Sequence, residues 1–413
     1  MPNAAGTPGA LSHIRVLDLS RILAGPWCTQ NLADLGAEVI KVERPGCGDD
    51  TRAWGPPWTQ DANGGDAADS TYYAAANRGK KSVTIDIASP DGQRLVRELA
   101  ARSDVVVENY KIGDLKRYGL DYDSLRQVNP GLVYCSITGY GQNGPSARKP
   151  GYDFVFQAIG GLMSITGERD DLPGGGPQKT GIAIADVITG MYATIAILAA
   201  LNHRAESGNG QYIDMALLDC IVALGGNQVT GYFANGHIPH RYGNAHASLV
   251  PYQVFTVADG EIVVAVGNDI QWQRYCEAIE RPDLAADARW AKVKGRIVGR
   301  NELVPELART MLARGAEDWI ARLEAAGVPC GRINNYEQVF QDPQVQYRGL
   351  RVDMPKADGG IVSTIASPLR LCGTPVKYQL PPPLIGDSTD YVLGQVLGYG
   401  QRDIQALKEK QVV

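Results

Sequence analysis

The first 140 residues alternate between strand patterns and helix patterns, and this alternation constrains the fold more than any other feature. Residues 14–19 (IRVLDL) form a strand pattern. Residues 20–36 carry apolar side chains at helical spacing and end on a glycine, and residues 37–42 (AEVIKV) form a second strand pattern. A strand, a helix and a strand within about thirty residues predict a βαβ unit with parallel strands and a right-handed crossover.

The same alternation continues along the chain. Strand patterns at 81–87 and 103–110 flank a helix pattern at 89–102, and another strand pattern follows at 132–140. Repetition of this unit predicts an α/β fold whose main part is a doubly wound, Rossmann-like domain.

The pattern changes from about Asn235. A β-hairpin pattern at 250–266 is followed by charged helical segments. We therefore predict that 1–234 form the N-terminal part of a large α/β domain and that 235–335 form a smaller inserted α+β domain. The C-terminal segment, 336–413, is expected to return to the large domain.

The run of small and apolar residues at 181–201 contains one ionisable side chain, Asp186. The segment 191–201 predicts a helix buried on all faces, and its interruptions by Thr and Gly argue against a membrane span. Aspartate is favoured at a helix N-cap, where it accepts N–H groups and the helix dipole favours its ionised form. From this run alone, a cap is the simpler interpretation and a nucleophilic carboxylate is the alternative.

Composition excludes several function classes. The 413 residues carry 40 Lys and Arg against 45 Asp and Glu, so the chain lacks the basic excess expected of a nucleic-acid or anionic-membrane binder. The N-terminal residues show no signal-peptide pattern, and we expect a cytoplasmic protein. The seven cysteines include no C-x-x-C pair and the five histidines no zinc motif, so we expect reduced thiols and no metal.

Motifs for nucleotides are weak. Residues 139–144 match G-x-G-x-x-G after a strand, but Pro145 and Pro150 follow and no helix begins there. Arg44 lies just past the second predicted strand, where a parallel sheet gathers its ligands. Arg44 could bind a phosphate there, or it could be an ordinary solvated charge.

Six blocks in one order, covering nearly the whole chain, resemble the class III CoA-transferases, also called the CaiB/BaiF family. These blocks are 17–52, 77–87, 105–125, 134–145, 151–167 and 184–201. Three further blocks are most similar to the dicarboxylate branch, typified by succinate–hydroxymethylglutarate CoA-transferase. They are 70–78, 241–255 and 331–345.

The resemblance implies transfer of CoA from an acyl-CoA donor such as succinyl-CoA to a carboxylic acid, and the dicarboxylate branch implies a dicarboxylic acid as the acceptor. Asp186 matches the family nucleophile and would form an aspartyl anhydride and then an aspartyl-CoA thioester. CoA is then a substrate, and no bound cofactor is expected. An acyl-CoA racemase or isomerase and a formyl-CoA:oxalate-type transferase are the alternatives. The family also implies an interlocked homodimer.

The resemblance also implies a CoA site. Arg44 matches a family residue at the CoA nucleotide, and Asn109 and Arg117 match residues that line the CoA groove. Lys80 and Lys81 match positions near the CoA phosphates.

Substrate positions follow in the same way. Leu23 stands where formyl-CoA transferases carry a glutamine, which argues against oxalate and formate. Tyr152 and Asp153 match an active-site Tyr-Glu pair. In the related racemases the first of these positions is a catalytic histidine, and a tyrosine of ordinary pKa about 10 is a poor base near neutral pH.

A dicarboxylate acceptor leaves a second carboxylate to be neutralised, for which an arginine fork is well suited. Arg21 and Arg78 are the candidates, with His246 as a polar neighbour.

Overall fold

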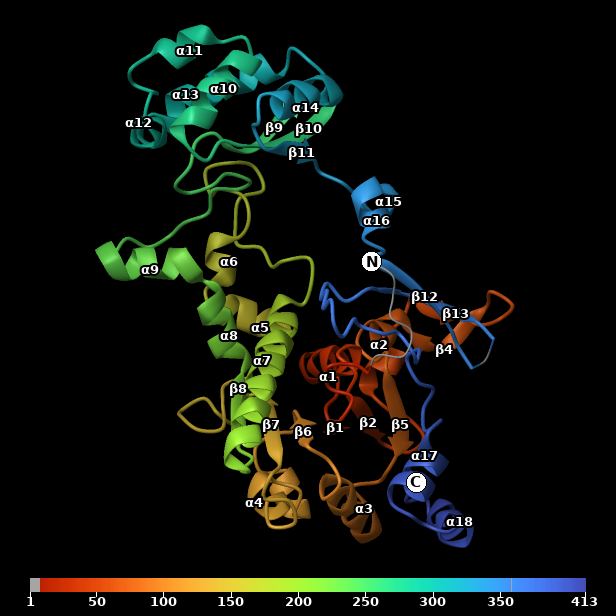
Figure 1. Cartoon of the computed structure of the whole chain (residues 1–413). Helices are drawn as coiled ribbons and strands as arrows, with labels where there is room; N and C mark the ends of the chain where they lie inside the picture. Colours follow the sequence, from red (N-terminus) through yellow and green to blue (C-terminus); the bar gives the residue numbers. More distant parts are fainter. Residues whose placement is uncertain (1–7, 358) are drawn as a thin grey trace. The chain divides into compact units, whose positions relative to one another are not determined.

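The computed structural model describes residues 8–357 and 359–413, and the chain divides into two compact units (Figure 1). Unit 1 contains the residues up to Leu162, Thr180–Val229 and Gln344–Val413, and unit 2 contains Met163–Lys179 and Thr230–Pro343. The domain boundaries expected from the sequence were 234/235 and 335/336. The structure divides the chain at 229/230 and 343/344 and adds residues 163–179 to unit 2.

Unit 1 is built on a six-stranded sheet in which every neighbouring pair is parallel (Figure 1). The strand order, β5-β2-β1-β6-β7-β8, is the order 3-2-1-4-5-6 of dinucleotide-binding folds. The chain therefore reverses its direction of winding between β1 and β6, and the carboxyl ends of these two strands border a crevice. The strands are β1 (Arg15–Asp18), β2 (Glu38–Glu43), β5 (Lys80–Thr84), β6 (Val105–Glu108), β7 (Val133–Thr138) and β8 (Tyr212–Ala216).

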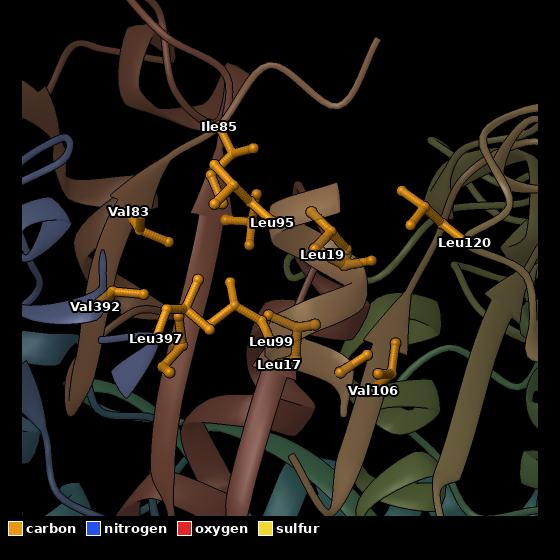
Figure 2. Packing of buried hydrophobic residues seen from close by; sticks show 14 of the residues in the cluster. Leu17, Leu19, Val83, Ile85, Leu95, Leu99, Val106, Leu120, Val392 and Leu397 are labelled. Atoms are coloured by element: carbon orange, nitrogen blue, oxygen red, sulfur yellow. The ribbon is translucent and has the colours of Figure 1, made fainter. Parts of the chain in front are cut away.

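Helices cover both faces of this sheet because successive strand side chains point to opposite sides. Leu17 and Val106 pack with Leu95 and Leu99 of α3, in a cluster that also contains C-terminal residues (Figure 2). Val16, Val105 and Val107 pack on the opposite face against α1 and α7. The covering helices are α3 (Pro90–Ala100), η3 (Val392–Val396) and α18 (Gln401–Glu409) on one face, and α1 (Ala24–Asp34), α5 (Asp153–Ile159), α7 (Ile184–Ser207) and α8 (Leu217–Leu224) on the other.

Helix α7 is the crossover between β7 and β8, and one of its faces is exposed. Ala193 and Ile197 are fully buried against the sheet, whereas Met191 is 47% and Ile195 59% exposed. The prediction of a helix buried on all faces was therefore wrong. Within the described residues, α7 is the one helix long and apolar enough to cross a membrane by length and composition. Its packing on the sheet identifies it as a core helix of the α/β fold.

The remaining elements of unit 1 are short. Two small antiparallel pairs, β3 with β4 and β12 with β13, were not predicted. These elements are η1 (Asp50–Ala53), β3 (Trp58–Gln60), β4 (Asp66–Ser70), α2 (Thr71–Ala75), η2 (Leu115–Tyr118), α4 (Tyr122–Leu125), β12 (Arg351–Pro355), β13 (Ile361–Ile365) and α17 (Thr389–Tyr391). Helices α6 (Leu162–Ile165), α9 (Gly226–Asn235) and α16 (Pro343–Tyr347) lie where the units divide.

Unit 2 has its own core and a three-stranded antiparallel sheet, ordered β11-β10-β9. The predicted hairpin is present, with Gly260 paired to Val257. Trp272 and Trp319 are buried against this sheet. The elements are β9 (Tyr252–Val257), β10 (Gly260–Ala265), α10 (Asp269–Ala278), α11 (Pro282–Ala286), α12 (Val293–Val298), α13 (Arg300–Met311), α14 (Ala316–Ala325), β11 (Cys330–Arg332) and α15 (Tyr336–Gln341).

Candidate active site

The loop from β1 to α1 is joined to the end of β6 at the point where the sheet changes direction. The Asn109 side chain donates to the Arg21 carbonyl at 2.7 Å and accepts the Arg21 backbone N–H at 2.9 Å. A single amide thereby ties together the carboxyl ends of the two strands that border the crevice. Ligands of doubly wound sheets bind at this position.

The same loop contains a strained residue. Ile22 has a φ of 73°, a left-handed conformation that is a genuine outlier for a β-branched side chain. Its N–H donates to Oδ1 of buried Asp49 at 3.3 Å, and Lys41 Nζ donates to Asp49 Oδ2 at 2.9 Å and to the Ser20 carbonyl at 3.0 Å. Strain of this kind persists where the surroundings fix it, and it clusters at functional sites.

Two of the predicted arginines gather beside Tyr110 at this edge. Arg21 forms a half-exposed ion pair with Asp50 at 2.9 Å and lies 5.3 Å from the Tyr110 ring centre. Arg44 is exposed, donates Nε to Cys47 Sγ at 2.9 Å, and interacts electrostatically with Asp50 and Tyr110. The cluster offers guanidinium groups to an anion.

Arg117 also follows β6 in the chain, on η2. It is 66% exposed and pairs with Asp114 at 2.9 Å, so its guanidinium remains accessible to a ligand. The segment that follows β6 also lines a cavity of about 410 Å³, whose wall contains Tyr110, Lys111 and Lys116. Glu108 also lines this cavity, and burial raises the pKa of its carboxyl to about 7.

The two lysines predicted to lie near the CoA phosphates donate their hydrogen bonds to groups of the protein. Lys80 is buried between the sheet and α1, where Nζ donates to Asp18, to the Asn77 side chain and to the Pro26 carbonyl at 2.9–3.1 Å. Lys81 lies near the amino end of β5 and donates to Glu38 at 2.6 Å, on the edge opposite Asn109. We therefore do not assign either lysine to a CoA phosphate.

Arg78 is equally committed. Its guanidinium binds Asp34 through Nε at 2.9 Å and Nη2 at 2.6 Å, and it is 5% exposed. A third nitrogen donates to Thr364 at 3.2 Å. Because this buried guanidinium donates to Asp34 and Thr364, it has no paired N–H groups available for a substrate carboxylate. The structure therefore does not support Arg78 as a substrate residue.

Asp186 lies in the first turn of α7 but does not cap it. Ala183 occupies the N-cap position, and the Asp186 carboxylate accepts no hydrogen bond from the described residues. Burial, and then the negative charge of Asp153, raise the pKa of Asp186 to about 7. The expectation that the helix end holds this carboxylate anionic through hydrogen bonds was therefore wrong.

The cap comes from Asp153 in the first turn of α5. Its Oδ1 accepts the N–H groups of Ala185 at 2.6 Å and Asp186 at 3.2 Å, and its Oδ2 accepts Gln157 Nε2 at 2.6 Å. Asp153 is therefore close to Asp186, as the family match implied. Both of its oxygens have protein partners.

Two further predicted positions lie close in the chain to these groups. Tyr152 precedes α5 and is 71% exposed. Leu23 is buried immediately before α1. The start of α1 packs against α7 at Gly190, where an added Cβ would lie 2.6 Å from the Ala24 carbonyl oxygen. Gly190 is one turn after Asp186 in α7.

His246 belongs to unit 2. Its Nδ1 accepts the Ser248 N–H at 2.9 Å, and its ring centre is 5.1 Å from that of Tyr252. Its assignment to the substrate stays a prediction.

The sequence profile of CoA-transferase family III matches residues 11–389. The chain belongs to CoA-transferase family III. Succinate--glutarate CoA-transferase of Agrobacterium fabrum is 47% identical, over 94% of this chain and 95% of that protein. Human succinyl-CoA:glutarate CoA-transferase is 41% identical, over 98% and 90%. A crystal structure of a CAIB/BAIF family protein from Brucella suis has a TM-score of 0.83 at 43% identity, covering 94% of this chain and all of that one.

Membership in family III confirms the family resemblance, the α/β fold and the enzyme class. CoA thioesters are the substrates of this class. No group of three or more His, Cys, Asp and Glu side chains that could hold a metal occurs among the described residues.

Two site residues of this CoA-transferase were missed by the sequence analysis. Burial, and then the charges of Asp186 and Asp153, raise the pKa of Tyr72 to about 12, so Tyr72 interacts electrostatically with both carboxylates while its phenol stays neutral. Gln157 is fully buried and holds Asp153. Tyr72 lies in block 70–78 and Gln157 in block 151–167, so both were within the matched residues, but nothing in their spacing linked them to Asp186.

Proposed function

We propose that this protein transfers CoA from succinyl-CoA to a small dicarboxylic acid, with Asp186 as the nucleophile, and that it acts in the cytoplasm. The proposal depends on the Asp186 carboxylate in a family III chain. Burial and the neighbouring Asp153 raise its pKa to about 7. Several relatives with names of the form succinyl-CoA:dicarboxylate CoA-transferase support the substrate class.

The chemistry uses the Asp186 carboxylate twice. Its oxygen attacks the thioester carbonyl of succinyl-CoA, the C–S bond breaks, and the products are an aspartyl–succinyl anhydride and CoA thiolate. The thiolate attacks the aspartyl carbonyl, which releases succinate and leaves an aspartyl-CoA thioester. The acceptor carboxylate then reverses both steps, so the energy of the thioester bond is kept. A carboxylate with a raised pKa is more basic, and hence more nucleophilic, than an ordinary aspartate.

The nucleotide part of CoA is expected at the crevice between β1 and β6. Arg44 is exposed and interacts with Tyr110, whose ring offers a flat apolar surface, and Arg117 is exposed on η2, which follows β6 in the chain. Asn109 fixes the loop beneath it.

Arg21 remains the candidate for the second carboxylate of the substrate. Its side chain is 43% exposed, its pair with Asp50 is half-solvated, and its Nε is buried without a hydrogen-bond partner. An incoming carboxylate would compete with Asp50 and satisfy the guanidinium more fully. This distinguishes Arg21 from Arg78, whose guanidinium is bound by Asp34.

We also propose that the enzyme is a homodimer, as the family implies. Helices α5, α7 and α8 of unit 1 expose large apolar side chains that water solvates poorly. They are Phe154, Val155, Ile159, Met191, Tyr192, Ile195, Val222 and Leu224. An exposed apolar set of this extent supports an interface with a second copy.

The test is a transfer assay with succinyl-CoA and, in turn, glutarate, mesaconate, citramalate and oxalate. New CoA esters are separated and identified by mass spectrometry. We expect glutaryl-CoA or another dicarboxylyl-CoA to form in proportion to the succinate released, and oxalate to be the poorest acceptor. Asp186→Asn should abolish transfer. Asp403→Asn, which changes an exposed aspartate in the first turn of α18, should leave it unchanged. Conversion of an acyl-CoA without any acceptor acid would instead identify an isomerase.

A further inference from the structure

Helix α7 starts without a side chain of its own to receive its free N–H groups. The first N–H groups of any helix lack partners within the helix. Here Asp153, 32 residues earlier on α5, accepts those of Ala185 and Asp186 through the same oxygen. The backbone that carries the Asp186 side chain is therefore held by a carboxylate from another helix.

The capping carboxylate is itself held on its other side. Gln157, one turn further along α5, donates Nε2 to Asp153 Oδ2 at 2.6 Å. Its Oε1 accepts the Thr180 N–H at 2.9 Å. Gln157 thus links α5 to the segment that leads into α7, and Asp153 has little freedom to leave its position.

We propose that Asp153 is a positioning residue for the transfer reaction: it caps α7 from α5, fixes the first turn that carries Asp186, and places its own carboxylate beside that of Asp186. This inference rests on the proposed role of Asp186 as nucleophile. It assigns Asp153 a role different from substrate binding, because hydrogen bonds to the protein occupy both of its oxygens.

The electrostatics around Asp186 agree with this arrangement. The N–H groups that carry the partial positive charge at the start of α7 donate two hydrogen bonds to Asp153. Burial raises the pKa of Asp186 to about 7, and the charge of Asp153 on α5 adds to this effect. Tyr72 on α2 also interacts with both carboxylates, and it stays neutral because its pKa is raised to about 12.

The arrangement favours the covalent states of the enzyme. Two neighbouring carboxylates repel each other while both are ionised. When Asp186 becomes an anhydride or a thioester it loses its charge, and this repulsion disappears. Asp153 therefore destabilises the free nucleophile relative to the acyl and CoA intermediates, without touching the substrate.

Three variants separate these effects. Asp153→Asn keeps an oxygen that can accept the α7 N–H groups but removes the charge. Asp153→Ala removes the cap and the charge. Asp403→Asn removes a charge of the same type from the exposed first turn of α18, on the other face of the sheet, and is the matched control.

The primary readout does not use CoA. Carboxyl groups are labelled by brief exposure to a water-soluble carbodiimide with an amine across pH 4.5–9, and the Asp186 peptide is quantified by mass spectrometry. In the wild type, the midpoint of labelling should lie near pH 7, where the pKa of Asp186 is placed. Asp153→Asn and Asp153→Ala should both move it to lower pH by about one pH unit or more, because a like charge has been removed. Asp403→Asn should not move it.

The second readout is the pH profile of CoA transfer. The acid limb of kcat should move with the labelling midpoint in Asp153→Asn. In Asp153→Ala, kcat should also fall by about tenfold or more, because the first turn is no longer held in place. An unchanged labelling midpoint in Asp153→Asn would overturn the inference, since a merely structural residue would alter stability and not the titration of Asp186. A moved midpoint without any transfer by the wild type would instead refute the proposed function and leave the relation of Asp153 to Asp186 standing.

Discussion

At the residue scale, the Asp186 carboxylate lies in surroundings that disfavour its negative charge, so its ionisation costs free energy in the folded protein. Burial and Asp153 raise its pKa to about 7 from an ordinary value of 3.8. Between these two values the folded chain binds a proton that the unfolded chain has released. The free energy of unfolding therefore falls as pH rises through this window, and the cost is fully present above pH 7.

Replacing Asp186 with asparagine should consequently stabilise the enzyme while it abolishes turnover. At pH 8.5 we expect Asp186→Asn to raise Tm by at least about 2 °C, because the cost of the buried charge is removed. Near pH 4 the difference should vanish, since Asp186 is then neutral in the wild type. Calorimetry at the two pH values measures this. A variant that is less stable than the wild type at pH 8.5 would contradict the raised pKa.

The two arginines predicted for the substrate should behave differently. Arg21→Gln should raise KM for glutarate by about tenfold or more, as expected for loss of a charge-assisted hydrogen bond, with little change in Tm. Arg78→Gln breaks a buried ion pair with Asp34 and should lower the free energy of unfolding by about 3–5 kcal/mol without selectively changing KM. Steady-state kinetics and denaturant unfolding distinguish them. An equal change of KM in both variants would contradict the assignment of Arg21.

The family resemblance pointed to Asp186 as the candidate nucleophile, but the sequence could not predict which charged side chains are free to bind a ligand. Arg21 and Arg78 are the same residue type, and each is close to a predicted strand or helix end. Only the folded structure shows that the guanidinium of Arg78 is already bound by Asp34. Lys80 was similarly misassigned because its three partners, at Asp18, Pro26 and Asn77, are brought together by the sheet. The capping of α7 by Asp153 also depends on a contact between helices.

At the scale of elements, the close crossing of α1 and α7 sets where the first turn of α7 lies. The crossing depends on Gly190, since a methyl group there would lie 2.6 Å from the backbone oxygen of Ala24. That oxygen belongs to the first residue of α1 and cannot move without displacing the helix.

Gly190→Ala should therefore lower both stability and activity. We expect a loss of about 1–3 kcal/mol from overpacking, and a lower kcat because the start of α7 shifts relative to α1. Gly231→Ala is the control: it lies within α9, a Cβ there meets nothing within 4 Å, and it should be neutral or slightly stabilising. Chemical unfolding and the transfer assay measure both variants. An equally stable, fully active Gly190→Ala would show that the crossing does not position Asp186.

The elements themselves were largely predictable. Short β-branched runs separated by helical spacing indicated the parallel strands β1, β2, β5, β6 and β7, because buried parallel strands are apolar on both faces. The small pairs β3–β4 and β12–β13 were missed because their sequences lack a sustained alternation. The exposed face of α7 was missed because a helix that is apolar all round does not indicate which side meets the core.

At the scale of the whole molecule, large apolar side chains of α5, α7 and α8 are exposed, and we propose that a second copy of the chain covers them. The sequence could suggest this only through the family resemblance, since apolar residues that face a second copy look the same as core residues. The described chain places Ile195 on this surface with 59% of its area exposed.

We predict a dimer of about twice the 44.4 kDa chain mass in solution. Ile195→Asp should shift the molecule towards the monomer, because it places a charge within the apolar interface. Val298→Asp, at an 80% exposed position in unit 2, is the matched control and should leave the dimer intact. Light scattering coupled to size-exclusion chromatography measures the mass. A monomeric wild type would contradict the dimer.

The most direct test of the central claim is the intact mass of the protein after incubation with succinyl-CoA, followed by hydroxylamine. The account predicts a CoA-sized adduct on the wild type that hydroxylamine removes and that Asp186→Asn does not form. The absence of an adduct with succinyl-CoA and with other acyl-CoA donors, or an adduct that persists in Asp186→Asn, would contradict Asp186 as the nucleophile of this CoA-transferase.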